Sequence, residues 1–393
     1  MSRRWYRGTD FKRALTIEEL RGVARQRTPH FAFEYVEGGA EDEHTLRRNR
    51  SVFDDYVLLP NTLVDVSQRN LKTTVFGREM AAPFAIAPTG FNGMLTHKAD
   101  VALARAAKAA GIPFTLSTVS TASIEEIASA AAGARHWMQL YVLRSREFAK
   151  HIVERALAAD YEALLVTTDV PVFGHREWDK RNFSRPMQLS LRSKLDVLRH
   201  PRWLFDVMIP HGVPRFGNLS AFLPKGQDSA EKGVAFVGQE LDQTLDWEAM
   251  RWVRDLWPRK LVIKGVLGVD DARRAVEIGA DGIVLTNHGG RQLDSTLAPL
   301  EVLPQVRAAV GDKLTLLIDS GFRRGADIVK ARALGADAVL LGRATLYGVA
   351  AGGEAGAAHA LEILRSEVDR VLALIGRPDI NQVGPDCVMK RSS

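Results

Sequence analysis

Eight short runs of apolar and β-branched residues, each bounded by turn residues, recur along the chain. They are FAIAP (84–88), PFTLST (113–118), HWMQLY (136–141), ALLVTTD (163–169), LVIKG (261–265), GIVLTN (282–287), LTLLIDS (314–320) and AVLLGR (338–343). Because these runs are nearly continuous rather than alternating, they predict strands that are covered on both faces, as in a parallel sheet.

Segments with apolar residues at helical spacing lie between these runs. The clearest are 98–111, 123–133, 269–279 and 325–335, and each ends at a glycine. Ser123 precedes Glu126 at the start of the second segment, which is the spacing of a capping box.

Eight alternating strand and helix units predict the α/β class and a closed (β/α)8 TIM barrel. A doubly wound open sheet is the alternative. However, no GxGxxG motif follows the first strand, where a dinucleotide-binding open sheet would carry it. The barrel is therefore favoured.

The rest of the chain is expected to surround this barrel within one domain, 1–393. Helices are predicted near 16–27 and 29–38. The predicted segments are an N-terminal helical cap (1–80), the barrel (81–176 and 247–376), an insertion in the fourth βα unit (177–246) and a C-terminal tail (377–393). A segment as long as the insertion is usually functional in a compact domain.

The composition is that of a globular protein. The 393 residues are 46% hydrophobic, and 53 basic residues are nearly balanced by 47 acidic ones, which argues against disorder. The one cysteine, Cys387, leaves no partner for an internal disulfide or a CxxC site, so a reducing compartment is expected and no metal site is predicted. No signal peptide or membrane span is expected either, because no apolar run reaches 18 residues.

The net charge of +6 is concentrated in one segment. Residues 176–225 hold ten Lys or Arg against four acids, which leaves the remainder neutral and argues against a nucleic-acid-binding surface over the whole protein. Within this segment, WLFDVMI (203–209) follows Arg199 and Arg202. Aromatic and aliphatic residues next to arginines are typical of a membrane-surface element. A lid, or a helix packed on the barrel, is the alternative.

Polar or glycine residues follow the predicted strands, at the end where such barrels carry their active sites. They are Thr89, Gly90, Ser117, Gln139, Tyr141, Thr167, Asp169, Lys264, Thr286, His288, Arg291, Asp319, Arg323, Gly342 and Arg343. Glycine amides and arginines in DSGFRRG (319–325) and GR (342–343) predict a phosphate site. Lys264, on an apolar strand, either stabilises an anionic cofactor or forms a Schiff base.

The stretch TNHGGRQLD (286–294) combines a histidine, the usual general base, with two glycines that let the backbone approach a flat ligand. Asp169 is suited to pair with an imidazolium, and Arg176 and Arg291 supply forked donors for a carboxylate. With the phosphate site, these residues predict an enzyme that acts on a small carboxylate beside a phosphate-bearing cofactor.

A larger set of motifs runs in order along nearly the whole chain. It comprises YVEGGAEDEHTL (35–46), IAPTG (86–90), STVS (117–120), QLYV (139–142), VTTD (166–169), IKG (263–265), TNHGGRQLD (286–294), DSGFRRGADIVKARALGAD (319–337) and LLGRATLYG (340–348). Together these motifs resemble the FMN-dependent L-2-hydroxy acid oxidase and dehydrogenase family. HPRW (200–203), DWEAMRWVRDLWP (246–258) and GRATLYGVAAGGEAG (342–356) are similar to its membrane-associated members, which act on (S)-mandelate and L-lactate.

The resemblance implies FMN as the cofactor and a role for each motif residue. The implied catalytic residues are His288 as the base, Asp169 as its support, Tyr141 at the α-hydroxyl and Lys264 beside the reduced anionic flavin. The implied substrate-binding residues are Tyr35, Tyr141, Arg176, His288 and Arg291. The implied cofactor-binding residues are Thr89, Gly90, Ser117, Gln139, Thr167, Lys264, Thr286, Asp319, Gly321, Arg323, Gly342 and Arg343. Whether His288 takes the α-proton or the hydroxyl proton is open, and both routes need the same residues.

Two departures from the family pattern bear on the substrate and the electron acceptor. Gly90 stands where the oxidases typically have Ala, which resembles the dehydrogenases that pass electrons to a membrane acceptor. Val119 stands where plant glycolate oxidase has Trp, so both positions are smaller here and favour a bulky or aromatic substrate.

The expected function is therefore oxidation of (S)-mandelate, or a similar bulky 2-hydroxy acid, to the 2-keto acid. The expected acceptor is a quinone or another respiratory-chain component, at the cytoplasmic face of the inner membrane, and the expected assembly is a homotetramer. The alternatives are an L-lactate dehydrogenase, an oxygen-using oxidase, a Schiff-base aldolase or isomerase, and a non-catalytic membrane-binding module.

Overall fold

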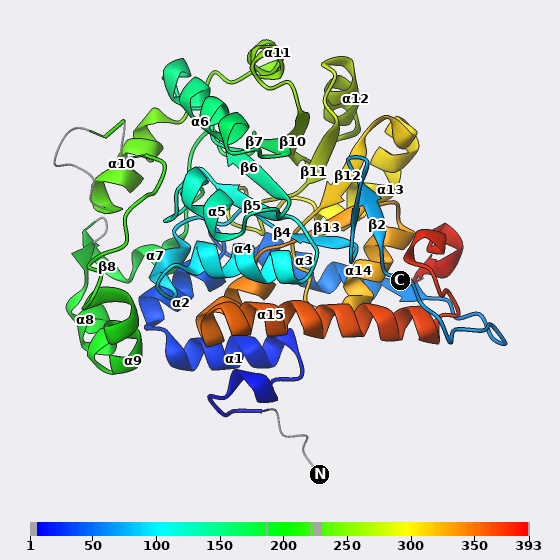
Figure 1. Ribbon diagram of the computed structural model, residues 1–393, viewed down its shortest axis with the longest axis horizontal. Coiled ribbons are helices and arrows are strands. Elements are labelled where there is room, and N and C mark those ends of the chain that lie inside the picture. Colours follow the sequence, from blue (N-terminus) through cyan, green and yellow to red (C-terminus); the bar gives the residue numbers. More distant parts are fainter. Residues whose placement is uncertain (1–5, 186–187, 220–221, 224–229, 392–393) are drawn as a thin grey trace.

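Eight parallel strands close into a barrel in the computed structural model, which describes residues 6–185, 188–219, 222–223 and 230–391. The strands are β4 (Phe84–Ile86), β5 (Phe114–Ser117), β6 (His136–Leu140), β7 (Ala163–Thr167), β10 (Lys260–Val266), β11 (Gly282–Leu285), β12 (Thr315–Ile318) and β13 (Ala338–Leu341). Seven of them lie within predicted apolar runs, and β10 extends one residue beyond its run at each end. β13 pairs with β4 and closes the ring, which confirms the TIM barrel (Figure 1).

Side chains from alternate strand positions fill the inside of the barrel. They are Ala85, Trp137, Ala163, Leu165, Val262, Val284, Leu317, Ala338 and Leu340. A hairpin of β2 (Thr73–Val75) and β3 (Arg78–Met80) lies at the N-terminal ends of the strands, where the Phe76 ring packs edge-on against Trp137 at 5.5 Å. This filled end leaves the opposite end of the barrel for a site.

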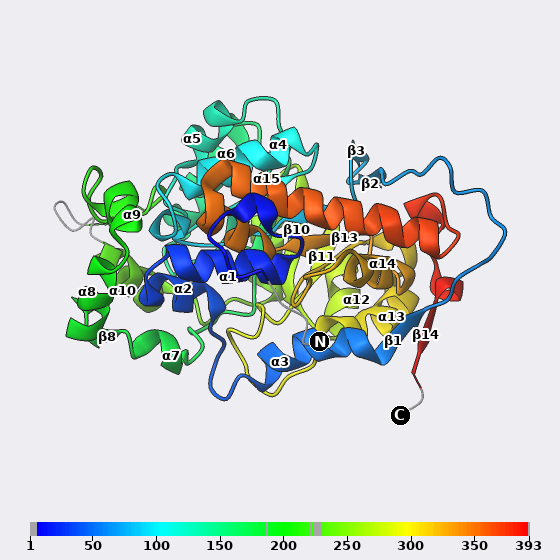
Figure 2. The same cartoon turned by 90° about the horizontal axis from the view of Figure 1, so that it is seen from below.

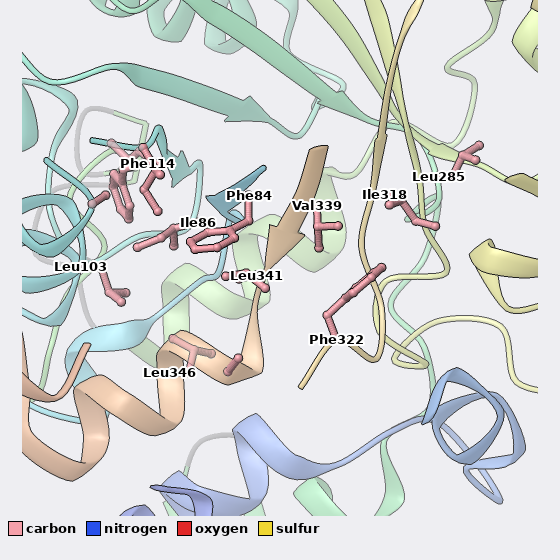
Figure 3. Close-up of a cluster of buried hydrophobic side chains, with 14 of the residues drawn as sticks. Phe84, Ile86, Leu103, Phe114, Leu285, Ile318, Phe322, Val339, Leu341 and Leu346 are labelled. Atoms are coloured by element: carbon pink, nitrogen blue, oxygen red, sulfur yellow. The ribbon is translucent and has the colours of Figure 1, made fainter. Parts of the chain in front are cut away.

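Helices surround the barrel and bury the outer faces of the strands. They are α4 (Ala99–Ala109), α5 (Ile124–Ala130), α6 (Arg146–Ala158), α11 (Trp247–Leu256), α12 (Val269–Glu277), α13 (Pro299–Val310), α14 (Gly325–Ala333) and α15 (Arg343–Leu374). Figure 3 shows this outer layer where Phe84 and Ile86 of β4 lie near Leu103 of α4 and Leu346 of α15. At the start of α5, the Ser123 hydroxyl accepts a hydrogen bond from the Glu126 amide at 3.1 Å, as the motif predicts.

The N-terminal cap contains α1 (Ile17–Arg27), α2 (His30–Glu37) and α3 (His44–Ser51). α1 packs alongside α15 (Figures 1 and 2). Between α2 and α3, the Ala40 amide donates to the Gly290 carbonyl at 2.8 Å, and the Glu41 amide donates to the His175 carbonyl at 2.9 Å. These bonds hold the YVEGG segment at the C-terminal ends of the barrel strands. Further along, β1 (Tyr56–Leu58) pairs with β14 (Val388–Lys390).

The insertion is largely structured and lies to one side of the barrel (Figures 1 and 2). Its elements are α7 (Glu177–Lys180), β8 (Phe183–Arg185), β9 (Gln188–Leu189), α8 (Leu191–Leu198), α9 (Pro201–Trp203), a π-helical turn (Leu204–Met208) and α10 (Ala230–Glu240). The Trp203 indole donates to the Met94 carbonyl at 2.8 Å, and the Gly217 amide donates to the Ser120 carbonyl at 3.0 Å. The insertion is thus anchored on the loops that follow β4 and β5. None of the helices in the described ranges is long and apolar enough to cross a bilayer.

Candidate active site

A cavity of about 360 Å³ opens at the C-terminal ends of the strands. The predicted residues that line it are Tyr35, Thr89, Gly90, Ser117, Gln139, Tyr141, Thr167, Arg176, Lys264, His288, Arg291, Asp319, Gly321, Arg323, Gly342 and Arg343. Two further predicted residues, Asp169 and Thr286, lie behind this lining and both bond to His288. The fold therefore brings together side chains that are spread over some 300 positions of the sequence.

The loop after β11 aims His288 into the cavity. The residue has a positive φ of 58°, and its amide donates to the Thr286 hydroxyl at 2.9 Å. Gly290, with a φ of 75°, packs so closely on the cap that a Cβ atom there would lie 2.7 Å from the Leu46 backbone. Glycine is required at this position, because any side chain would separate the loop from the cap.

His288 is held between an acid and a phenol. Its Nδ1 atom lies 3.1 Å from Asp169 Oδ1, and its Nε2 atom lies 3.5 Å from the Tyr141 hydroxyl. Burial is the largest influence on the pKa of His288 and lowers it, and the Lys264 charge acts in the same direction while Asp169 opposes both. A neutral imidazole that donates its Nδ1 proton to Asp169 keeps the Nε2 lone pair free for a ligand.

Asp169 is ionised and Tyr141 is protonated, which are the states that suit a neutral His288 imidazole between them. Burial raises the pKa of Asp169, but the opposing effects of His288 and Lys264 keep that pKa below its ordinary value, so the carboxylate is ionised. Burial raises the pKa of the Tyr141 phenol, which therefore stays protonated and available as a donor.

Two guanidinium groups and a phenol gather at one side of the cavity. Arg291 donates to the Gly38 carbonyl at 2.9 Å, and its guanidinium lies 5.2 Å from the centre of the Tyr35 ring. The Tyr35 hydroxyl donates to the Gly90 carbonyl at 3.3 Å. Arg176, at the start of α7, lines the same side. These forked donors suit a carboxylate.

Arg291 keeps its charge at neutral pH. Burial lowers the pKa of Arg291 to about 9, with further lowering by the like charges of Arg176 and Arg343. Because this pKa lies well above 7, the Arg291 guanidinium stays protonated. Its burial and the repulsion from the neighbouring arginines therefore favour the binding of an anion.

A row of polar side chains crosses four neighbouring strands, β5, β6, β7 and β10. Gln139 on β6 accepts a hydrogen bond from the Ser117 hydroxyl at 3.0 Å and donates to the Thr167 hydroxyl at 2.9 Å. Lys264, on the next strand β10, is 3% exposed, and its Nζ atom lies 3.5 Å from Asp319 Oδ2. An amide, hydroxyls and a buried cation in one row suit a polar ring with negative charge.

Two arginines follow the last two strands. The Arg343 guanidinium donates to the carbonyls of Val36, Gly38 and Gly289 at 2.7 to 2.9 Å. Arg323 lies with its guanidinium 5.3 Å from the centre of the Tyr347 ring. Both side chains keep further N–H donors beyond these contacts, and α15 begins at Arg343. Guanidinium donors beside a helix N-terminus suit a phosphate.

Another part of the cavity lining is apolar, and much of it escaped the sequence prediction. Its residues are Phe91, Met94, Val119, Phe173, Phe183, Phe216, Val234 and Val237. Phe216 comes from the insertion and packs against Phe91 with ring centres 4.9 Å apart and ring planes tilted by 40°. No local pattern links these two segments. Asp179 and Lys180 also line the cavity, and the sequence analysis did not predict them. Their position one helical turn after Arg176 could have indicated that they lie at the site.

Comparison with known proteins gives one consistent result. Residues 24–390 match the family described as FMN-dependent dehydrogenase. The chain is 50% identical over 371 residues to (S)-mandelate dehydrogenase of Pseudomonas putida, covering 94% of this chain and 92% of that protein. It is 43% identical over 377 residues to an L-lactate dehydrogenase of Chromohalobacter salexigens, covering 95% of each.

Solved structures agree. The crystal structure of the monotopic membrane protein (S)-mandelate dehydrogenase matches with a TM-score of 0.92 at 48% identity, over 96% of this chain and 100% of that one. Mandelate oxidase with (S)-4-hydroxymandelic acid matches with a TM-score of 0.81 at 34% identity, over 94% and 97%. The polar row with its buried lysine, and the arginine pair beyond it, fit the ring and the phosphate of FMN. The chain belongs to the FMN-dependent dehydrogenase family.

Proposed function

We propose that the protein oxidises an L-2-hydroxy acid to the 2-keto acid, and that the substrate is (S)-mandelate or a similar aromatic acid. The observation that carries this proposal is the position of His288, with Nδ1 on Asp169 and Nε2 toward the cavity that Arg176 and Arg291 line. One base beside two carboxylate-binding groups matches a substrate with its reacting carbon next to a carboxylate.

The reaction removes two electrons and two protons from the substrate, and bound FMN supplies the electron acceptor. Arg176, Arg291 and Tyr35 would hold the carboxylate, and Tyr141 would donate to the α-hydroxyl. His288 Nε2 would then take one proton, either from the α-carbon or from the hydroxyl as the α-hydrogen leaves as hydride. In both routes Asp169 stabilises the imidazolium that forms.

Other residues would hold the cofactor. Ser117, Gln139 and Thr167 would bind the ring system, together with Thr89, Gly90 and Thr286. Lys264, buried at the end of β10, would stabilise negative charge on the ring. Arg323 and Arg343, with Asp319, Gly321 and Gly342, would bind the ribityl chain and the phosphate.

The apolar side of the cavity supports an aromatic substrate. Phe91 and Phe216 form a ring pair there, and the small residues Gly90 and Val119 line the same cavity. Aromatic rings bury large areas against such walls. L-lactate, with only a methyl group, is the second candidate, because relatives that share 43% of the sequence are L-lactate dehydrogenases.

The first test is the visible spectrum of the purified protein without oxygen. The FMN-loaded protein is expected to bleach faster with (S)-mandelate than with L-lactate. Faster bleaching by L-lactate would move the assignment to the second candidate. The variant His288→Asn is expected to bind FMN and to stay yellow with either acid, and normal bleaching of this variant would remove His288 from its role.

We also propose that the protein binds the surface of a membrane through the insertion. Exposed apolar side chains there form a group that we call the insertion patch: Leu191, Leu195, Leu198, Phe205, Ile209 and Val213. The first three lie at helical spacing on α8, and exposed Arg192, Arg199 and Arg202 lie among the patch residues. Exposed apolar side chains together with arginines on the same segment suit an anionic lipid surface.

Membrane attachment bears on the electron acceptor. A quinone or another respiratory-chain component would accept electrons at the cytoplasmic face of the inner membrane, and the mandelate dehydrogenase with the similar structure is a monotopic membrane protein. Turnover of a lipid-soluble quinone by vesicle-bound protein tests the acceptor, and light scattering tests the homotetramer that the resemblance implies.

A further inference from the structure

An acidic residue with no assigned part lies beside the two arginines. Asp179, on α7 one turn after Arg176, lines the cavity. Its Oδ1 atom is buried and has no hydrogen-bond partner among the described residues. The charged groups that face it are Arg176 and Lys180 on its own helix and Arg291 and Glu34 from other elements.

A buried carboxylate oxygen without a hydrogen bond is costly. Burial raises the pKa of Asp179, and the nearby charges of Arg176, Arg291 and Lys180 act against this rise. No ion pair within 4 Å joins Asp179 to either arginine in the described part of the chain, so it acts on them through its field rather than by fixing their geometry.

The net charge of the two arginines and Asp179 bears on which ligands can bind. Two guanidinium groups carry one charge more than a single substrate carboxylate neutralises. An ionised Asp179 supplies the missing negative charge, so the group of Arg176, Arg291 and ionised Asp179 is neutral once one carboxylate is bound. A ligand with two carboxylates would bring an excess negative charge close to Asp179.

We propose that Asp179 sets the net charge of this group at +1 and thereby selects 2-hydroxy acids with one carboxylate over those with two. This inference rests on the proposed carboxylate-binding role of Arg176 and Arg291. It makes Asp179 a specificity-determining residue, with no part in proton transfer.

The test is the affinity of two small ligands for the FMN-loaded protein, measured by titration calorimetry. Pyruvate carries one negative charge and oxalate carries two, and the two ions are similar in size. In Asp179→Asn we expect affinity to rise about 10-fold for pyruvate and about 100-fold for oxalate, since the Coulomb energy doubles with the ligand charge. Asp179→Glu keeps the charge and is expected to keep the wild-type preference.

Glu177→Gln is the matched control, because it removes a negative charge from the same helix at an exposed position that does not line the cavity. We expect this variant to change neither affinity. Asp179→Ser, which is smaller and also uncharged, replaces the asparagine variant if that protein does not fold, as judged by thermal unfolding.

Each result separates the inference from the proposed function. Equal changes for pyruvate and oxalate, or no change for either, would overturn the role of Asp179. Failure of the wild-type protein to bind both ligands would instead refute the carboxylate site itself. Loss of FMN from both uncharged variants, but not from Asp179→Glu, would assign Asp179 to the cofactor site and also overturn the inference.

Discussion

Gly90 and Val119 are in contact so close that no side chain fits between them. A Cβ atom on Gly90 would lie 2.5 Å from Val119 Cγ2 and 3.3 Å from the Val119 carbonyl oxygen. Both residues line the cavity. The two departures from the oxidase pattern are therefore one coupled feature, because a larger residue at position 90 requires Val119 to move.

Gly90→Ala should lower kcat/KM for (S)-mandelate by about tenfold, since the displaced Val119 enters the cavity and core overpacking costs about 1–3 kcal/mol. The double variant with Val119→Ala removes the clash and should recover most of the loss. A double-mutant cycle of dye-linked rates measures the coupling. Additive effects would show that the contact has no influence on substrate binding. An oxygen electrode, run in parallel, tests whether alanine at position 90 also increases oxygen use.

The pH profile should reflect the buried imidazole. Because burial lowers the pKa of His288, the acid limb of kcat/KM should lie below pH 6.5, the ordinary histidine value. Asp169→Asn removes the carboxylate that raises this pKa, so the limb should move to still lower pH while the maximal rate falls. A limb that moves upward in this variant would contradict the assigned pairing.

The insertion patch should control attachment to lipid. Replacing Phe205 and Ile209 by serine removes two side chains that are 62% and 58% exposed. Each contributes about 1.5–3 kcal/mol when buried, so binding to anionic vesicles should weaken at least tenfold while dye-linked activity is kept. Leu63→Ser, at a fully exposed leucine in the N-terminal cap, is the control. Co-sedimentation at two salt concentrations separates the apolar contribution from the electrostatic one. An equal loss of vesicle binding in this variant and in Leu63→Ser would refute the role of the insertion patch in membrane binding.

The ring pair in the cavity should affect large substrates selectively. Phe216 is 6% exposed and packs against Phe91, so Phe216→Ala should raise KM for (S)-mandelate at least tenfold and that for L-lactate much less. Phe222→Ala is the matched control, because Phe222 belongs to the same insertion but packs on Phe148, and it does not line the cavity. Steady-state kinetics with both acids gives the comparison, and a parallel rise in both KM values would argue for general disorder instead.

The barrel could be predicted because its signals are local. Each strand is an apolar run, and the residue that reaches the cavity lies near the C-terminal end of the run, as Lys264 and Gln139 do. Parallel strands place all their ends on one side, so the position of a residue near the end of a run is enough to assign it to the site.

The insertion could not be predicted in the same way. Phe216 contacts Phe91 next to the hydrogen bond from the Gly217 amide to the Ser120 carbonyl, and such a contact between distant segments leaves no periodic pattern in the sequence. The insertion (177–246) also contributes to the site, since Phe183, Phe216 and residues of α10 line the cavity, while its membrane-binding role stays a prediction. Deleting 180–240 would remove this wall, whereas replacing the part from α8 to the π-helical turn spares it.

The pairing of β4 with β13 fixes the order in which the protein matures. Synthesis releases β4 early, but its partner and the arginine that follows that partner come close to the other end of the chain. β1 likewise has no pairing partner until β14 has been synthesised. A nascent chain therefore has no complete flavin site, and its unpaired strand edges must be kept from other chains until β13 and β14 have been synthesised. The barrel must therefore close before the protein can bind FMN.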